Sequence, residues 1–308
     1  MGIGLHGCTW PSARVSSAFR LTRLRHGGAH IGGHHHAEHP VGSSGMTLDA
    51  ELLRTRLADT RWHRIEVVDA TGSTNADLVT RAATEPIDGT VRLTTDQTAG
   101  RGRHARTWTA PRGTQLAMSA AVEVGEHTEH LGWLSLLAGL AAVQGIGEAV
   151  GVRPTLKWPN DVLIDGRKTA GILSEYTRSP HTRGGDGGVA VIGTGLNTTM
   201  TQDQLPVPTA TSLQLVTGKD IPLTELAASY LRALSELLDL WPHDVDGLAA
   251  RYREDSDTIG RRVRLVLPGD EEVVGTATGV DASGRIVVDA DGRQVIAAAG
   301  DVTHLRPV

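Results

Sequence analysis

The stretch of residues 157–173, KWPNDVLIDGRKTAGIL, carries the clearest folding signal in the chain. Two short apolar runs, residues 162–164 and 170–173, flank the pair Asp165-Gly166. An Asp-Gly pair favours a tight turn whose backbone needs positive φ, and apolar runs on both sides of it are typical of paired strands. The stretch therefore predicts a β-hairpin.

The same stretch contains two of the three lysines in a chain whose other basic residues are arginines. Lys157 precedes the expected hairpin, and Lys168 follows its turn. Lysine presents a compact point charge, whereas arginine presents a wide planar fork of donors. This choice of residue favours a functional role for Lys168, while Lys157 fits a surface or strand-edge charge equally well.

A second basic segment, residues 97–108, reads QTAGRGRHARTW and is called the arginine loop below. Arginines bind anions, and the interleaved glycines let a backbone come close to a ligand. The segment matches neither the phosphate-binding pattern G-x-x-x-x-G-K-[ST] nor a dinucleotide fingerprint. It predicts an anion-binding loop whose ligand is a nucleic-acid backbone, a nucleotide phosphate or a carboxylate. The three arginines are Arg101, Arg103 and Arg106.

Two polar segments complete the set of candidate ligand-binding stretches. Residues 72–75, GSTN, stand at an expected helix start, where Ser, Thr and Asn either cap the helix or bind a polar ligand. Residues 193–197, GTGLN, follow an apolar strand, and their glycines let a ligand approach the backbone. Each segment also has a purely structural interpretation, as a helix cap and as a strand exit.

Composition narrows the class of protein. The chain has 308 residues and a net charge of −5, whereas proteins that neutralise nucleic-acid phosphates usually carry a basic surplus. A single cysteine, Cys8, excludes an internal disulfide framework and a cysteine metal cluster. The longest apolar stretch, near residues 136–143, is shorter than the roughly 20 residues that span a bilayer. We expect a cytoplasmic protein that binds neither DNA nor membrane.

The periodicity of apolar residues predicts an α+β fold from residue 46 onward. Closely spaced short strands after residue 258 predict a small separate barrel. The expected helices cover residues 48–57 with Thr47 as the cap, 131–150, 223–241 and 248–252. Residues 71–78 predict a turn that runs into a further helix, which carries Leu78, Val79, Ala82 and Ala83 inward. The expected strands cover residues 64–69, 90–95, 115–124, 189–193, 262–267, 273–280, 285–289 and 294–298.

Taken in order, GSTN, QTAGRGR, KWPND with GRKTAGIL, and GTGLN resemble the catalytic domain of the biotin protein ligases. The resemblance covers residues 62–305. It implies a mixed-sheet catalytic domain of the biotin/lipoate ligase type over residues 46–257 and a small SH3-like β-barrel over residues 258–308. Lipoate ligases share the catalytic fold but lack the GRGR sequence, so they match less well.

The resemblance also implies an activity. Biotin and ATP would form biotinyl-5′-adenylate and pyrophosphate, with Mg²⁺ carried by ATP. Biotin would then pass to a lysine of a biotin carboxyl carrier domain of an acetyl-CoA, acyl-CoA or pyruvate carboxylase. Such an enzyme is a biotin–[acetyl-CoA-carboxylase] ligase.

The same resemblance assigns roles to individual residues. Lys168 and Arg103 are the expected catalytic residues, and Asp161 is the candidate Mg²⁺ ligand. The expected biotin-binding residues are Ser73, Thr74, Asn75, Gln97, Arg101, Gly102, Arg103 and Lys168. The expected ATP-binding residues are Arg103, Arg106, Asn160 and Asn197, and the expected apolar wall is Trp108, Gly171 and Ile172.

Residues 1–45 hold seven of the fourteen histidines, many glycines and little hydrophobic periodicity. They predict a disordered Gly/His-rich leader, or translation from a start upstream of Met46, with a metal site at His34–His36 and His39 as the alternative. The short distance from Met46 to the first catalytic strand predicts a monofunctional ligase without a DNA-binding domain. Two other functions stay open, a lipoate or octanoyl protein ligase and a non-enzymatic nucleic-acid-binding protein.

Overall fold

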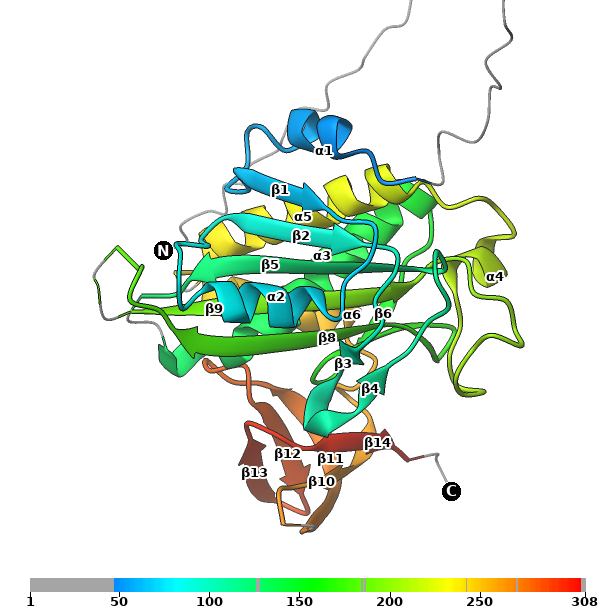
Figure 1. Cartoon of the computed structure of the whole chain (residues 1–308). Coiled ribbons are helices and arrows are strands. Elements are labelled where there is room, and N and C mark those ends of the chain that lie inside the picture. Colours follow the sequence, from blue (N-terminus) through cyan, green and yellow to red (C-terminus); the bar gives the residue numbers. More distant parts are fainter. Residues whose placement is uncertain are drawn as a thin grey trace, which may run out of the picture. The chain divides into compact units, whose positions relative to one another are not determined.

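The computed structural model describes residues 47–305 apart from residues 126, 127, 184, 186, 242 and 270. The leader interpretation and the histidine site within residues 1–45 lie outside the described residues. A seven-stranded mixed sheet forms the centre of the fold (Figure 1). Its order is β1(Arg64–Val67), β2(Thr90–Thr94), β5(Gln115–Glu123), β9(Gly188–Asn197), β8(Arg167–Arg178), β7(Asp161–Ile164) and β6(Thr155–Lys157).

Strand pairing in this sheet is parallel only between β1 and β2, and every other pair is antiparallel. The predicted hairpin is confirmed as the turn between β7 and β8, where Asp165 and Gly166 have φ values of 50° and 71°. Both turn residues therefore take the left-handed backbone that the Asp-Gly pair tolerates. This turn places Lys168 at the start of β8.

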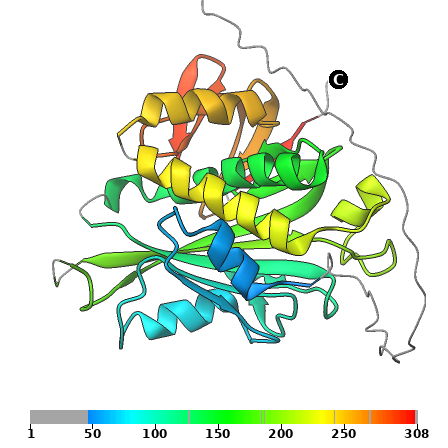
Figure 2. The same cartoon turned by 90° about the horizontal axis from the view of Figure 1, so that it is seen from above.

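Helices cover both faces of the sheet (Figure 2). The long helices α3(Gly132–Val150) and α5(Leu223–Leu240) pack against each other on one face, and α2(Thr74–Arg81) packs on β5 and β9 on the other. Helix α1(Ala50–Arg56) begins two residues later than predicted, because Asp49 rather than Thr47 accepts the amides of Glu51 and Leu52. The remaining helices are α4(Leu213–Thr217) and α6(Val245–Asp255), with 3₁₀ turns at Arg103–Ala105 and Thr128–His130.

Helix α3 is apolar on nearly all sides because it lies inside the fold. By length and composition it could cross a bilayer, yet 67% of its apolar window is buried within the protein. Gly145 lets α5 approach closely, since a Cβ there would meet the Tyr230 backbone at 2.7 Å. The apolar character of α3 is therefore explained by the core that α3 shares with α5.

The C-terminal residues form a second, five-stranded antiparallel sheet. This sheet lies where the sequence predicted closely spaced short strands, and the α+β fold class is confirmed. Alternate residues of β11 are buried, as in a sheet with one face on a core. The last strand of this five-stranded sheet along the chain was not predicted from the sequence. The order is β13(Arg293–Ala297), β12(Ile286–Ala290), β11(Glu272–Val280), β10(Arg262–Val266) and β14(Asp301–His304).

Two tryptophans, one in the turn between β6 and β7 and one on α3, anchor this second sheet. The buried Trp158 donates its indole N–H to the Gly284 carbonyl at 3.3 Å, and its amide donates to Thr258 Oγ1 at 3.1 Å. Trp133 donates its indole N–H to the Ala282 carbonyl at 2.9 Å. The KWPND segment, which contains Trp158, is thus held from both sheets.

Candidate active site

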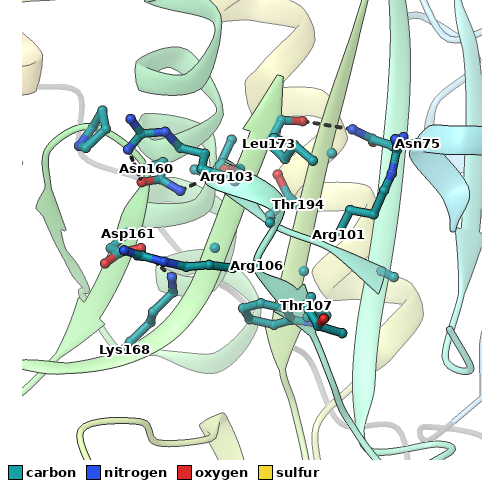
Figure 3. Close-up of a pocket in the computed structure, with 18 of the residues that line it drawn as sticks. Asn75, Arg101, Arg103, Arg106, Thr107, Asn160, Asp161, Lys168, Leu173 and Thr194 are labelled. Atoms are coloured by element: carbon teal, nitrogen blue, oxygen red, sulfur yellow. Dashed lines mark hydrogen bonds and ion pairs between the residues drawn. The ribbon is translucent and has the colours of Figure 1, made fainter. Parts of the chain in front are cut away.

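A cavity of about 370 Å³ lies where the start of α2, the arginine loop, the middle of the sheet and β14 meet. Figure 3 shows its basic side chains pointing inward from several elements. Of the residues to which the resemblance assigns a role, all except Asn197 line this cavity. Those residues are Ser73, Thr74, Asn75, Gln97, Arg101, Gly102, Arg103, Arg106, Trp108, Asn160, Asp161, Lys168, Gly171 and Ile172.

The start of α2 supplies a neutral, polar end of the cavity. Ser73 is the helix N-cap, and its Oγ accepts the Ala76 amide at 3.4 Å. Thr74 donates its amide to Gln97 Oε1 at 3.0 Å, and its hydroxyl oxygen lies 3.2 Å from the same atom. Among the described residues the Gln97 side-chain nitrogen has no partner, so it can donate to a ligand carbonyl.

The amide of Asn75 has a defined orientation. Its Nδ2 donates to the Leu173 carbonyl at 3.0 Å (Figure 3). Its Oδ1 lies 2.6 Å from Ser119 Oγ. Because Oδ1 only accepts, the single Ser119 proton belongs to this bond. Thr74 Oγ1, at 2.7 Å from Ser119 Oγ, then keeps its own proton for Ser119 or Gln97. Buried hydroxyls and amides therefore form a connected network at this end.

The arginine loop bends at residues other than its glycines. We expected glycines to provide the bend, but Gly102 is extended, with φ −122° and ψ −179°. His104 and Ala105 carry the left-handed backbone instead, with φ values of 54° and 56°. Gly100 serves close packing, since a Cβ there would lie 2.5 Å from the Trp108 carbonyl oxygen. The loop is closed by the two-residue strands β3(Gly100–Arg101) and β4(Thr107–Trp108).

The arginines of the loop reach different partners. Arg101 pairs with Glu175 at 2.8 Å, and Arg106 pairs with Asp301 at 2.5 Å. Arg103 donates to Asn160 Oδ1 at 3.2 Å.

Arg103 is the arginine of the loop that points most fully into the protein. Its side chain is 20% exposed, against 43% for Arg101 and 68% for Arg106. Burial lowers the pKa of the Arg103 guanidinium, while the charges of Asp301 and Asp161 oppose this shift. The group stays protonated at neutral pH, because an isolated guanidinium loses its proton only above about pH 12. Arg103 thus supplies a fixed positive charge in a partly desolvated position.

Lys168 supplies the second inward cation. Its Nζ lies 2.5 Å from Asp161 Oδ1 and 5.8 Å from the centre of the Trp108 ring. The backbone of Lys168 makes two hydrogen bonds of 2.8 Å with residues that follow β9. Its amide donates to the Thr209 carbonyl, and its carbonyl accepts from the Thr211 amide. The lysine is therefore fixed at both its backbone and its ammonium end.

Trp108 forms the apolar wall between the neutral and the cationic ends. A Cβ on Gly195 would meet its ring at 2.8 Å, and one on Gly171 would meet it at 3.0 Å. The indole N–H donates to Gln115 Oε1 at 2.9 Å. The two glycines of the sheet therefore make room for the indole, which separates the polar amides from Lys168.

The segment GTGLN lies inside strand β9 and not at its exit. Pairing with β5 on one side and β8 on the other continues through this segment, which corrects the predicted strand end. Asn197 is buried, and its Nδ2 donates to the Thr211 carbonyl at 3.0 Å, so the structure places it outside the cavity. Gly193 takes part in the site instead, since a Cβ there would meet Asn75 Oδ1 at 2.2 Å.

Three polar residues around the cavity were missed in the sequence. Ser119 and Glu175 lie within strands whose sequences appear apolar. Asp301 lies on β14, which was not predicted because the C-terminal sequence is rich in turn residues. An acidic residue between apolar residues of a strand is usually a surface residue, so its type alone did not indicate a role for Glu175. The one signal in the sequence was that Glu175 lies two residues after the GRKTAGIL segment. The pairings of Glu175 and Asp301 with the arginine loop are visible only in three dimensions.

Comparison with known families covers both parts of the chain. The Biotin/lipoate A/B protein ligase family matches residues 67–197, and the Biotin protein ligase C terminal domain matches residues 258–305. The first match contains the arginine loop and the two lysines, and the second contains β14. Every residue that lines the cavity thus falls within one of the two matched ranges, residues 301–303 within the second and the others within the first.

Individual relatives agree with these matches. The chain is 44% identical over 267 residues to the biotin–[acetyl-CoA-carboxylase] ligase of Mycobacterium tuberculosis, covering 84% of this chain and 96% of that protein. It is 31% identical over 232 residues to the bifunctional ligase/repressor BirA of Escherichia coli, covering 74% of this chain and 70% of that protein.

Solved structures share the fold. The biotin protein ligase from Aquifex aeolicus in complex with biotin and ATP superposes with a TM-score of 0.65 at 22% identity, covering 79% of this chain and 100% of that chain. The two family matches and the high identity across nearly the whole mycobacterial ligase show that this chain belongs to the biotin protein ligase family.

Proposed function

We propose that the chain is an ATP-dependent biotin–[acetyl-CoA-carboxylase] ligase that works in the cytoplasm. It activates biotin as biotinyl-5′-adenylate and then transfers biotin to a lysine of a biotin carboxyl carrier domain. The observation that carries the proposal is the division of one cavity into a neutral hydrogen-bonding end at Thr74, Asn75 and Gln97 and a cationic end at Arg103 and Lys168. Relatives with this named activity support it.

The first step requires two anions to approach each other. The biotin carboxylate is ionised at neutral pH, because carboxyl pKa values lie near about 4. Its oxygen attacks the α-phosphorus of ATP, an O–P bond forms, the α–β anhydride bond breaks, and pyrophosphate leaves. No general base is needed, so the protein contributes position and fixed positive charge. Arg103 and Lys168 provide that charge from two elements held independently.

The neutral end suits the ureido ring of biotin. That ring offers two N–H donors and one carbonyl acceptor, and it carries no charge. The free Gln97 amide nitrogen can donate to the carbonyl, while hydroxyls at the start of α2 can accept from the ring. Trp108 lies between this end and Lys168, where the aliphatic part of biotin would run.

Mg²⁺ fits as an ion carried by the nucleotide. The described residues hold no cluster of three or more His, Cys, Asp or Glu side chains that could bind a metal by themselves. Mg²⁺ in nucleotide sites usually takes phosphate and water oxygens with one or two carboxylates. Asp161 lines the cavity and could supply one such carboxylate, although Lys168 pairs with it here. When bound, the ion would neutralise phosphate charge.

The second step transfers the acyl group. The neutral ε-amine of the carrier lysine attacks the adenylate carbonyl, a C–N bond forms, the C–O bond to phosphate breaks, and AMP leaves. The adenylate hydrolyses if water reaches it, so the cavity must stay covered until the carrier arrives. The arginine loop stands over the cavity and is tethered from both sheets by the partners of Arg101 and Arg106. We assign it the role of a lid.

One experiment tests the proposal. The protein is mixed with Mg-ATP, biotin and a biotin carboxyl carrier domain, and the product is probed with avidin. Biotinylated carrier is the expected result, and a carrier that stays unlabelled by folded protein would overturn the proposal. Replacing biotin with lipoate or octanoate distinguishes the related ligase activity.

A nucleic-acid-binding function is the alternative from another class. Two of the three loop arginines already pair with carboxylates of the protein, which disfavours a surface that neutralises many phosphates. A salt-dependent mobility shift of a generic oligonucleotide, together with no biotin-dependent activity, would favour it.

A further inference from the structure

Glu175 joins two parts of the cavity wall through a single carboxylate oxygen. It lies on β8, and its Oε2 accepts from Arg101 Nη2 at 2.8 Å and from Asn75 Nδ2 at 2.9 Å. Arg101 belongs to the arginine loop, and Asn75 belongs to the start of α2. Glu175 itself is not among the residues that line the cavity. It stands behind two residues that do.

Toward α2, Glu175 determines which way the Asn75 amide faces. Both N–H groups of Nδ2 are used, one by the Leu173 carbonyl and one by Glu175. The carbonyl oxygen must then face Ser119. The two ends of an amide have nearly the same shape, so packing alone does not choose between them. The acceptors at Leu173 and Glu175 make that choice.

Toward the loop, Glu175 holds a strand that has little else to fix it. Strands β3 and β4 have two residues each, and a two-stranded ribbon is marginal by itself. The Arg101 side chain is 43% exposed, and its ion pair among the described residues is with Glu175. This pair anchors the entry of the loop, as the Arg106–Asp301 pair anchors its exit.

We propose that Glu175 is a positioning residue that couples the ureido end of the cavity to the lid, an inference that rests on the proposed biotin ligase function. When the ureido ring of biotin is bound and the Asn75 amide keeps its orientation, Glu175 Oε2 accepts from Asn75 and from Arg101 together. A ring that displaces Asn75 disturbs Glu175 and with it the anchor of the loop. Recognition of the ring and retention of the adenylate are therefore linked through one side chain.

The test compares Glu175→Ala and Glu175→Gln with the wild type. The alanine variant loses both bonds, and we expect the KM for biotin and the rate of adenylate release without carrier each to rise about tenfold, as for a lost charge-assisted hydrogen bond. The glutamine variant keeps an acceptor oxygen for Asn75 but loses the charge that holds Arg101. It should therefore release adenylate faster, with a biotin KM within about threefold of the wild type. The KM for ATP should stay within about twofold in both variants, since neither partner belongs to the cationic end.

Glu66→Gln is the control, because Glu66 is likewise a partly buried carboxylate that pairs with arginines, namely Arg64, Arg81 and Arg92, and it does not line the cavity. It should leave the biotin KM and adenylate release unchanged. If Glu175→Ala does not fold, the separation of KM from release in Glu175→Gln decides the question. Biotin-dependent pyrophosphate exchange in the wild type together with unchanged release in the glutamine variant would refute the positioning role alone. Absence of that exchange in the wild type would refute both the role and the proposed function.

Discussion

The carboxylate of Asp301 on β14 accepts a hydrogen bond from Arg106 of the arginine loop at 2.5 Å, although the two residues are 195 positions apart in the chain. The residue before Asp301 takes part as well, since the Gly300 carbonyl accepts from Arg103 at 3.3 Å. Burial raises the pKa of the Asp301 carboxyl, but the hydrogen bond from Arg106 and nearby positive charges lower it by more. Asp301 therefore stays ionised at neutral pH and holds the lid from the C-terminal sheet.

We predict that Asp301→Asn loosens the lid without removing any cation from the cavity. Adenylate release in the absence of carrier should rise by about fivefold or less, because the pair is partly exposed and solvent weakens it. The measurement is the appearance of free biotinyl-5′-adenylate in a single-turnover reaction. Glu272→Gln is a control in the same sheet, since Glu272 makes only a long, exposed pair with Arg264. Equal release by Asp301→Asn and wild type would show that the pair does not hold the lid.

Lys168→Ala should nearly abolish the first step. Removing a preorganised positive charge from a reacting phosphoryl group costs roughly 2–4 kcal/mol, which is about 30- to 1000-fold in rate. Biotin-dependent ATP–pyrophosphate exchange measures this step. Lys219→Ala is the control, because Lys219 is an exposed lysine after α4 and does not line the cavity. Wild-type exchange in the Lys168 variant would remove this residue from the mechanism.

Gly193→Ala should weaken biotin binding more than ATP binding. The new methyl group would lie 2.2 Å from Asn75 Oδ1 and 2.8 Å from its Cγ, so the amide must move away from Ser119. We expect the KM for biotin to rise about tenfold or more, because a buried polar network is disrupted. Gly147→Ala in α3 serves as the control, since its added methyl meets only the Val152 carbonyl at 3.9 Å. Steady-state kinetics with each substrate varied in turn will show whether the effect is confined to biotin.

Stability should fall in mild acid through His304, on β14. Burial lowers its pKa below the usual 6.5, Asp257 opposes this shift, and Lys157 and Arg261 add to it. The unfolded chain therefore takes up a proton at this histidine at higher pH than the folded chain does. The contribution of His304 to the free energy of unfolding is complete above pH 6.5. It is lost as the pH falls toward the pKa of the folded state, by at most about 1.4 kcal/mol per pH unit.

Urea denaturation of wild type and His304→Gln at pH 7.5 and pH 5.5 measures this contribution. The wild type should lose more unfolding free energy between these values than the variant does. The two proteins differ only at residue 304, so the difference between their losses isolates the contribution of His304. An equal loss in both would show that the neutral form of this side chain is not favoured by folding.

Much of this fold could be predicted because the local signals agreed with the tertiary structure. The Asp165-Gly166 turn, the apolar helix α3 and the strand β5 appeared at nearly their predicted residues. The extent of β9 could not be predicted, because its glycines look like a strand exit until two partner strands pair with them.

The candidate site was predictable to the degree that its residues share short motifs. Residues of the arginine loop and the KWPND segment do line one cavity. The carboxylates that hold those cations could not be found in the same way. The roles of Glu175 and Asp301 depend on their pairs with Arg101 and Arg106, which are 74 and 195 positions away in the chain. Long-range ion pairs leave no periodicity or spacing in a sequence.

The position of β14 in the cavity wall also has a consequence for biosynthesis. A nascent chain displays the arginine loop and Lys168 long before residues 301–303 are translated, yet these three residues line the same cavity. Until they leave the ribosome, Arg106 lacks the carboxylate that restrains it. The cavity wall is thus completed only after residues 301–303 have been translated and β14 has packed beside the arginine loop.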